Sequence, residues 1–199
     1  MKKTLRLHRH SLKDSKDNTI GPRGQALAAA VAEAIIDQPV SDHFRGPLIR
    51  TEQTLDAMLN SNARQQFENV YDHEPIHELG SQELFDQMLE PKVGGKGFKE
   101  LAPVLGNRRA IWVLHSPNMY NFYLSLVKAG VEQMFHEMVG DFAIGAFHSP
   151  TVEMAAEAFD HEVPEQFPEM SCVDFEMNDT GEITVICHWV CNIAVPDEG

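Results

Sequence analysis

The pattern that decides the fold lies in residues 4–35, which read TLRLHRHSLKDSKDNTIGPRGQALAAAVAEAI. The short run Thr4–Leu7 ends in a polar cluster, and Gly21-Pro22 then fits a turn that leads into a helix. From Gly24 onward the apolar side chains recur at helical spacing, at Leu27, Ala30, Val31, Ala34 and Ile35. This order of strand, polar loop and helix is typical of an α/β unit whose loop lies at the carboxyl edge of a sheet, where open sheets bind their ligands.

The rest of the chain continues the alternation of helices and strands. Helical spacing and end signals predict helices over Leu48–Leu59, Ser81–Leu89 and Val152–Phe159. The predicted strands are Phe67–Tyr71, Ala110–Leu114, Phe142–Phe147, Cys172–Met177 and Ile183–Ile193, the last two forming a hairpin. The pattern predicts one domain over residues 1–199 with a three-layer α/β/α fold and a mainly parallel central sheet.

Charge limits the partners of the chain. Its 199 residues include 16 Lys and Arg against 30 Asp and Glu, which gives a net charge of -14. Such a protein is not attracted non-specifically to nucleic acid or to anionic membranes, so we expect neither as a partner. The N-terminal segment Met1–His10 has the cations of a signal peptide but no apolar region behind them, and a cytoplasmic protein is therefore expected.

The cysteines and glycines do not suggest a metal or a nucleotide cofactor. Cys187 and Cys191 lie in an apolar run that is best interpreted as a strand, where their side chains would be about 13 Å apart, too far to share a zinc ion. The odd cysteine count, three, argues against a disulfide framework. The glycines of the linker Pro91–Gly97 lack the spacing of a phosphate-binding loop. We therefore expect no cofactor and no metal.

Two motifs early in the chain resemble those of the histidine phosphatase (phosphoglycerate-mutase-like) superfamily. That family opens with a strand ending in Arg-His-Gly, and here Arg9-His10-Ser11 has serine in place of the glycine. Its next segment, Leu-Thr-x-x-Gly-x-x-Gln-Ala, is matched at Thr19 and Gln25-Ala26, whereas Asn18 replaces the leucine and Pro22 the glycine.

A third motif of the family contains an arginine that contacts the transferred phosphoryl group. Its pattern is Ser-Pro-x-x-Arg-(Ala/Thr)-x-Gln-Thr-(Ala/Leu), and residues 46–55 read GPLIRTEQTL. Gly46 stands where serine is usual, and every other specified position agrees, so the resemblance assigns the phosphate-binding role to Arg50.

The last two site residues of the family have two candidates each in this chain. The family's proton donor is a glutamate in a loop of the kind Leu-x-Glu-x-x-Gly, which is matched best by Glu78, with Glu74 as the alternative. Its second histidine follows an apolar strand. Both His115 and His148 fit, and His148 is favoured because a helix and the terminal β pair follow it.

The resemblance implies a metal-independent phosphatase that hydrolyses a small phosphorylated substrate. His10 would be the nucleophile and form a phosphohistidine, and Arg9, Arg50 and His148 would bind the phosphoryl oxygens. Glu78 would protonate the leaving group. A non-catalytic relative that binds a phosphorylated ligand and a phosphoglycerate-type mutase remain alternatives, and the sequence leaves the oligomeric state open.

Overall fold

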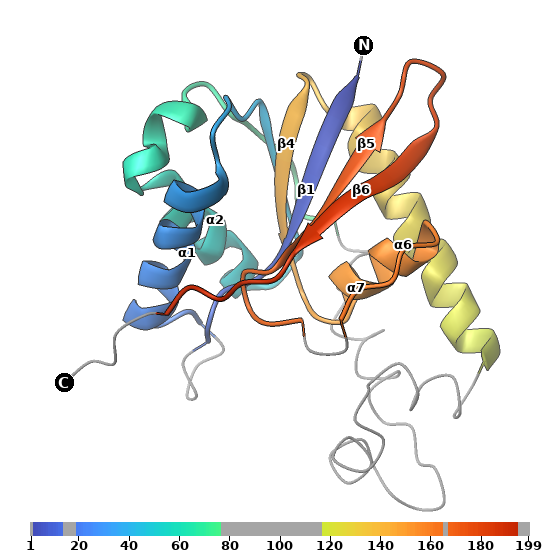
Figure 1. Cartoon of the computed structure of the whole chain (residues 1–199), viewed down its shortest axis with the longest axis horizontal. Helices are drawn as coiled ribbons and strands as arrows, with labels where there is room; N and C mark the ends of the chain where they lie inside the picture. Colours follow the sequence, from blue (N-terminus) through green and yellow to red (C-terminus); the bar gives the residue numbers. More distant parts are fainter. Residues whose placement is uncertain (1, 14–18, 77–116, 165–166, 195–199) are drawn as a thin grey trace, which may run out of the picture.

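A six-stranded sheet lies between two layers of helices in the computed structural model of the protein, which describes residues 2–13, 19–76, 117–164 and 167–194 (Figure 1). The strand order is β3-β2-β4-β1-β5-β6. The bounds of the strands are β1 Lys3–Arg9, β2 Asp42–Arg45, β3 Tyr71–Asp72, β4 Phe142–Phe147, β5 Cys172–Met177 and β6 Ile183–Trp189. The α/β fold class predicted from the sequence is confirmed.

The sheet is mixed, which corrects the expectation of a mainly parallel one. Among the described strands, three neighbouring pairs are parallel, β1 with β4, β4 with β2 and β2 with β3. The other two, β1 with β5 and β5 with β6, are antiparallel. The tight turn before β6, in which Gly181 has a φ of 83°, reverses the chain directly, so that β5 and β6 form the hairpin predicted from the sequence.

Helices cover both faces of the sheet (Figure 1). On one face, α1 (Pro22–Ile35) and α2 (Ile49–Leu59) pack against each other and form a core with Phe142, Ile144 and Ala146 of β4. On the other face lie α6 (Pro117–Glu137) and α7 (Thr151–Ala158), whose core includes Leu5 and Leu7 of β1. Alternate side chains of the central strands therefore fill two separate cores. None of the described helices is long and apolar enough to cross a membrane.

The region after α2 differs from the sequence prediction. Phe67 ends a 3-10 helix, Asn62–Phe67, and the strand predicted over Phe67–Tyr71 lies further on, as β3. The strand β2 was not predicted, because its four residues, Asp-His-Phe-Arg, have no alternation of apolar and polar side chains. The predicted elements Ser81–Leu89 and Ala110–Leu114 lie outside the described residues.

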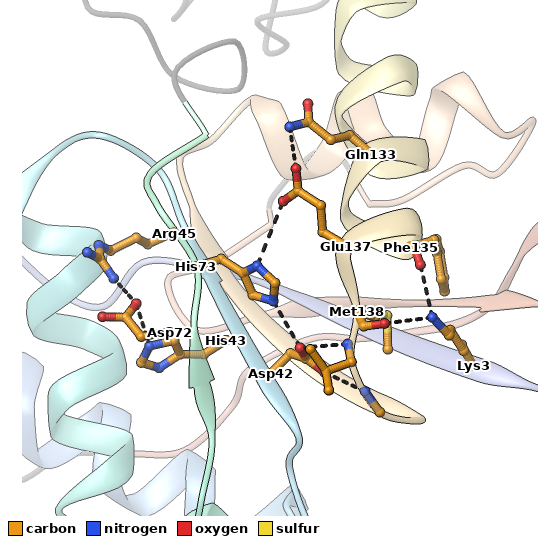
Figure 2. A network of polar contacts seen from close by, with 12 residues as sticks. Lys3, Asp42, His43, Arg45, Asp72, His73, Gln133, Phe135, Glu137 and Met138 are labelled. Atoms are coloured by element: carbon orange, nitrogen blue, oxygen red, sulfur yellow. Dashed lines mark hydrogen bonds and ion pairs between the residues drawn. The ribbon is translucent and has the colours of Figure 1, made fainter.

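A buried carboxylate fastens the amino end of β2 to the turn that follows α6 (Figure 2). Asp42 accepts hydrogen bonds from the backbone N–H groups of Val139 at 2.9 Å and Gly140 at 3.1 Å, and from Nε2 of His73 at 2.9 Å. Burial favours the neutral acid, but these bonds and one from Ser41 outweigh it and lower the pKa of Asp42. The ionised side chain thus joins the start of β2 to the residue after β3 and to the turn before β4.

Candidate active site

Three neighbouring parallel strands deliver the site residues to one edge of the sheet. Arg9 ends β1, and the N–H of His10 donates to the carbonyl of Phe147, the last residue of β4, at 2.8 Å. The N–H of Gly46, directly after β2, donates to the carbonyl of Ala146 at 3.0 Å. His10, Gly46 and His148 therefore lie side by side at the carboxyl edge, where open α/β sheets bind ligands.

His10 is held in the tautomer that a nucleophilic imidazole requires. Its Nδ1 lies 2.7 Å from the carbonyl oxygen of Ser11, which can only accept, so Nδ1 carries the proton and Nε2 keeps a lone pair. Burial lowers the pKa of the ring to about 3, and the positive charges of Arg50, Arg9 and Lys13 act in the same direction. The ring is thus neutral at physiological pH.

His148 lies edge-on to His10, with the ring centroids 5.1 Å apart and the planes at 64°. Neither of its buried ring nitrogens has a hydrogen-bond partner among the described residues. Burial lowers its pKa to about 2, and Arg50, His10 and Arg9 contribute in that order. Buried polar atoms in native proteins are nearly always paired, so a ring without a partner among the described residues could bind a polar ligand.

Arg50 supplies a cation without an acidic partner. It lies in the first turn of α2, and in the part of the chain that the structure describes no carboxylate forms an ion pair with it. Its Nε is buried and has no hydrogen-bond partner there. Burial lowers the pKa of Arg50, but a guanidinium remains protonated in proteins. A half-buried arginine that has no acidic partner among the described residues and lies beside two neutral histidines could bind a small anion.

Arg9 is held by the segment that precedes β5. Its Nη2 donates to Oε1 of Glu169 at 2.7 Å, and its Nη1 donates to the carbonyl of Phe167 at 2.5 Å. Its Nε is buried and has no partner among the described residues. Sequence reasoning did not identify Glu169, because only folding brings it to Arg9, and a single glutamate beside a proline in an acidic segment carries no distinctive signal.

The residues that match the third motif also support the loop after β1. The N–H of Ser11 donates to Oγ1 of Thr54 at 3.0 Å, and the N–H of Ile20 donates to Oε1 of Gln53 at 3.0 Å. Ser11, which replaces the usual glycine, donates its hydroxyl to the carbonyl of Gly24 at 2.6 Å. The substitution therefore adds a bond between the loop and α1, and it leaves His10 at the edge of the sheet.

The structure describes only part of the predicted site. It places Arg9, His10, Arg50 and His148 together, whereas Glu78 and His115 lie outside the described residues. Glu74 is exposed and forms no hydrogen bond or ion pair with the residues that the structure describes. Within residues 2–13, 19–76, 117–164 and 167–194, no three His, Cys, Asp or Glu side chains gather in a way that could hold a metal ion.

Comparison with solved structures shows that the chain shares the fold of a phosphoglycerate mutase and of SixA phosphatases. The phosphoglycerate mutase of Bacillus anthracis matches with a TM-score of 0.65 over 92% of this chain and 91% of its own, at 14% identity. The protein histidine phosphatase SixA complexed with tungstate matches with a TM-score of 0.57 over 96% and 97%, at 15% identity. A putative phosphohistidine phosphatase SixA from Agrobacterium tumefaciens gives 0.53 over 94% and 98%, at 17% identity.

At these identities the likeness concerns the fold. No model of a protein family matches the sequence, and no curated protein matches it. The activity must therefore be argued from the site itself.

Proposed function

We propose that the protein is a histidine phosphatase, a hydrolase that removes the phosphoryl group from a small phosphorylated substrate through a phosphohistidine at His10. The observation that carries the proposal is the neutral ring of His10, whose Nδ1 proton is held by the Ser11 carbonyl while Nε2 keeps its lone pair. Beside it lie the cation of Arg50 and the ring nitrogens of His148, which have no partners in the part of the chain that the structure describes. This is the arrangement that attack on a phosphate ester requires.

In the first step Nε2 of His10 attacks phosphorus. The new P–N bond forms as the bond from phosphorus to the ester oxygen breaks, and the leaving oxygen takes a proton from a carboxylic acid. We propose Glu78 as that acid, with Glu74 as the alternative. In the second step water attacks phosphorus and gives one proton to the carboxylate formed in the first step, the P–N bond breaks, and inorganic phosphate leaves a neutral His10 and a restored carboxylic acid.

Arg50, Arg9 and His148 would stabilise the negative charge on the phosphoryl oxygens. The side chain of Arg50 donates to none of the described residues, whereas Arg9 offers Nε and the N–H bonds not directed at Glu169 and Phe167. His148 is neutral in the ligand-free site and can donate one N–H, and a bound dianion would favour its protonation. No step of the scheme uses a metal ion.

The contacts of Arg9 favour one alternative, a non-catalytic relative that binds a phosphorylated ligand. Both Nη atoms of Arg9 already have protein acceptors, which leaves Arg50 as the main cation for the phosphoryl group. Gly46 also lacks the hydroxyl of the family's serine. Such a protein would bind phosphate without turning over an ester.

The test is hydrolysis of p-nitrophenyl phosphate without added metal, with His136→Ala at an exposed histidine of α6 as the control. We expect the wild type and the control to hydrolyse the ester at similar rates. The kcat of His10→Ala should be lower by at least about 10³-fold, which is the order found when a nucleophile is removed. Equal rates for wild type and His10→Ala would refute the proposal. Binding of inorganic phosphate with no turnover across a panel of esters would support the non-catalytic alternative.

A further inference from the structure

Ser11 connects the loop after β1 to both helices on one face of the sheet. Its N–H donates to Oγ1 of Thr54 in α2 at 3.0 Å, and its hydroxyl donates to the carbonyl of Gly24 in α1 at 2.6 Å. Its own carbonyl accepts the hydrogen bond from Nδ1 of His10 at 2.7 Å. Ser11 is wholly buried, so water does not replace any of these contacts. The residue that sets the tautomer of His10 is therefore itself held by two helices.

The hydroxyl of Thr54 is oriented to accept the hydrogen bond from Ser11. It donates its hydrogen to the carbonyl of Arg50, one helical turn earlier, at 2.7 Å, because a carbonyl oxygen can only accept. The lone pairs of Oγ1 then remain for the N–H of Ser11. Thr54 is also wholly buried. This one hydroxyl thus links the turn of α2 that carries Arg50 to the loop that carries His10.

Loss of this hydroxyl would affect the two ends of the link unequally. The carbonyl of Arg50 lies in a regular helix, where backbone N–H groups already supply hydrogen bonds. The N–H of Ser11 has no other acceptor among the described residues. A buried N–H without an acceptor is unfavourable, so the peptide group between His10 and Ser11 would turn toward another partner. The Ser11 carbonyl would shift with it, and the Nδ1 proton of His10 would lose its acceptor.

We propose that Thr54 is a positioning residue that holds His10 in the tautomer with Nδ1 protonated, and that it acts through the backbone of Ser11. Neutral imidazole carries its proton on either nitrogen, and only the form with a lone pair on Nε2 can attack phosphorus from that atom. The proposal goes beyond the proposed function, in which Thr54 has no part, and rests on it only for the effect on catalysis. The tautomer itself is a property of the ligand-free protein.

Long-range proton–nitrogen NMR correlation of the imidazole rings, at pH 7 and without substrate, measures the tautomer directly. Burial lowers the pKa of His10 to about 3, so its ring is neutral at this pH, and the spectrum of His10→Ala assigns its signals. We expect Nδ1 to be protonated in the wild type. Thr54→Val removes the hydroxyl and should give a mixture that includes the form with Nε2 protonated, whereas Thr54→Ser should restore the wild-type signals. A wild type with Nε2 protonated, or an unchanged tautomer in Thr54→Val, would overturn the proposal.

Thr51→Val is the matched control. Thr51 is also wholly buried in α2, and its hydroxyl lies 2.7 Å from the carbonyl oxygen of Gly46 and 2.6 Å from that of Leu48. The variant loses a buried hydroxyl from the same helix, but the tautomer of His10 should stay as in the wild type. An equal change of tautomer in Thr51→Val and Thr54→Val would assign the effect to general damage to α2 and refute the proposal. Should Thr54→Val not fold, Thr54→Cys, with a sulfur that accepts hydrogen bonds only weakly, tests the same contact with the same two outcomes.

Steady-state kinetics measures the effect on catalysis. Thr54→Val should lower kcat for p-nitrophenyl phosphate by roughly 10–10²-fold, the order expected when a reacting group is displaced. The inhibition constant of inorganic phosphate should stay close to that of the wild type, because the side chain of Arg50 keeps its place on α2. Thr54→Ser should recover most of kcat. An inhibition constant that rises in proportion to the fall in kcat would show that Thr54 serves phosphate binding, and would contradict the proposal.

The two proposals fail in different ways. If the tautomer responds to Thr54 as predicted but the wild type hydrolyses no ester, the positioning role stands and the phosphatase activity is refuted. If the wild type hydrolyses p-nitrophenyl phosphate through His10 but Thr54→Val changes neither the tautomer nor kcat, the activity stands and the positioning role is refuted. If Thr54→Val changes the tautomer without lowering kcat, attack by Nε2 is refuted and the positioning of the ring stands.

Discussion

At the scale of single residues, burial is the main cause that lowers the pKa values of His10 and His148, and among the charges Arg50 contributes more than Arg9 to both shifts. We expect Arg50→Ala to lower kcat/KM for a phosphate ester by about 10²–10³-fold, the usual cost of losing one donor to a developing anion. Arg50→Lys keeps the charge but not the planar pair of donors, so an intermediate loss is expected. Arg64→Ala, at an exposed arginine, is the control. A steady-state assay in which Arg50→Ala matches this control would contradict the assignment.

Glu169 is a positioning residue in this account, since it acts through Arg9. Among the described residues, Glu169→Ala leaves the Arg9 side chain with only the Phe167 carbonyl as an acceptor, and we expect the inhibition constant of inorganic phosphate to rise about tenfold with little change in melting temperature. Glu169→Gln keeps an acceptor oxygen and should recover part of the affinity. Tighter phosphate binding in Glu169→Ala would show instead that the carboxylate competes with the ligand for Arg9.

The four site residues that were identified from the sequence all lie at the ends of secondary-structure elements. Arg9, His10, Arg50 and His148 each lie at the end of a recognisable strand or in the first turn of a helix, in short motifs that resemble those of the histidine phosphatase family in the same order, and this resemblance selected them. Glu169 has no such local pattern, because its contact with Arg9 spans 160 positions. The choice of proton donor stays a prediction, since Glu78 lies outside the described residues.

At the scale of elements, the close approach of α1 to the loop after β1 constrains Gly24. A Cβ atom at Gly24 would lie 2.2 Å from the carbonyl oxygen of Leu12, far inside van der Waals contact, whereas one at Gly46 would have no neighbour closer than 3.5 Å. Gly24→Ala gains up to about 1 kcal/mol of helix propensity. The clash outweighs this gain, and we expect a net loss of roughly 1–3 kcal/mol.

Urea unfolding of Gly24→Ala and Gly46→Ala measures the difference directly. Gly46→Ala should stay within about 0.5 kcal/mol of the wild type, as most unstrained substitutions do. Equal stability of the two variants would mean that the loop after β1 moves away from α1 freely, and the support that this loop gives to His10 would then be in doubt.

The elements that the sequence predicted well are those in which apolar residues recur at a clear helical or strand spacing. The strand Phe142–Phe147 has the predicted bounds, and α1, α2 and α7 begin within two residues of the predicted positions. Short elements such as β2 and β3 are held by hydrogen bonds to β4 and to each other, and by the buried Asp42, so their own residues carry little signal. The antiparallel attachment of β5 to β1 likewise depends on pairing between distant segments.

At the scale of the whole molecule, buried neutral histidines make stability depend on pH. Burial lowers the pKa of His8 to about 4, below the value of about 6.5 expected in the unfolded chain. Between these values the unfolded state binds the additional proton, so the free energy of unfolding decreases as the pH falls from 6.5 to 4. The contribution of His8 to this decrease is on the order of 3 kcal/mol.

Urea unfolding at pH 7 and pH 4.5, in a buffer without phosphate, tests this expectation. His8→Leu should lose less stability on acidification than the wild type, and His136→Gln, at an exposed histidine, should lose as much as the wild type. If His8→Leu loses as much stability on acidification as the wild type, the pH dependence comes from His10, His148 and the carboxylates instead.

The central claim is that Nε2 of His10 accepts the phosphoryl group, and mapping of the phosphoenzyme tests it most directly. The protein is mixed with a phosphate ester, quenched in alkali, in which a P–N bond survives, and analysed by tandem mass spectrometry. The account predicts an acid-labile phosphate on His10 that is absent from His10→Ala. Turnover with a phosphate on another residue, or with none on His10 at any quench time, would contradict it.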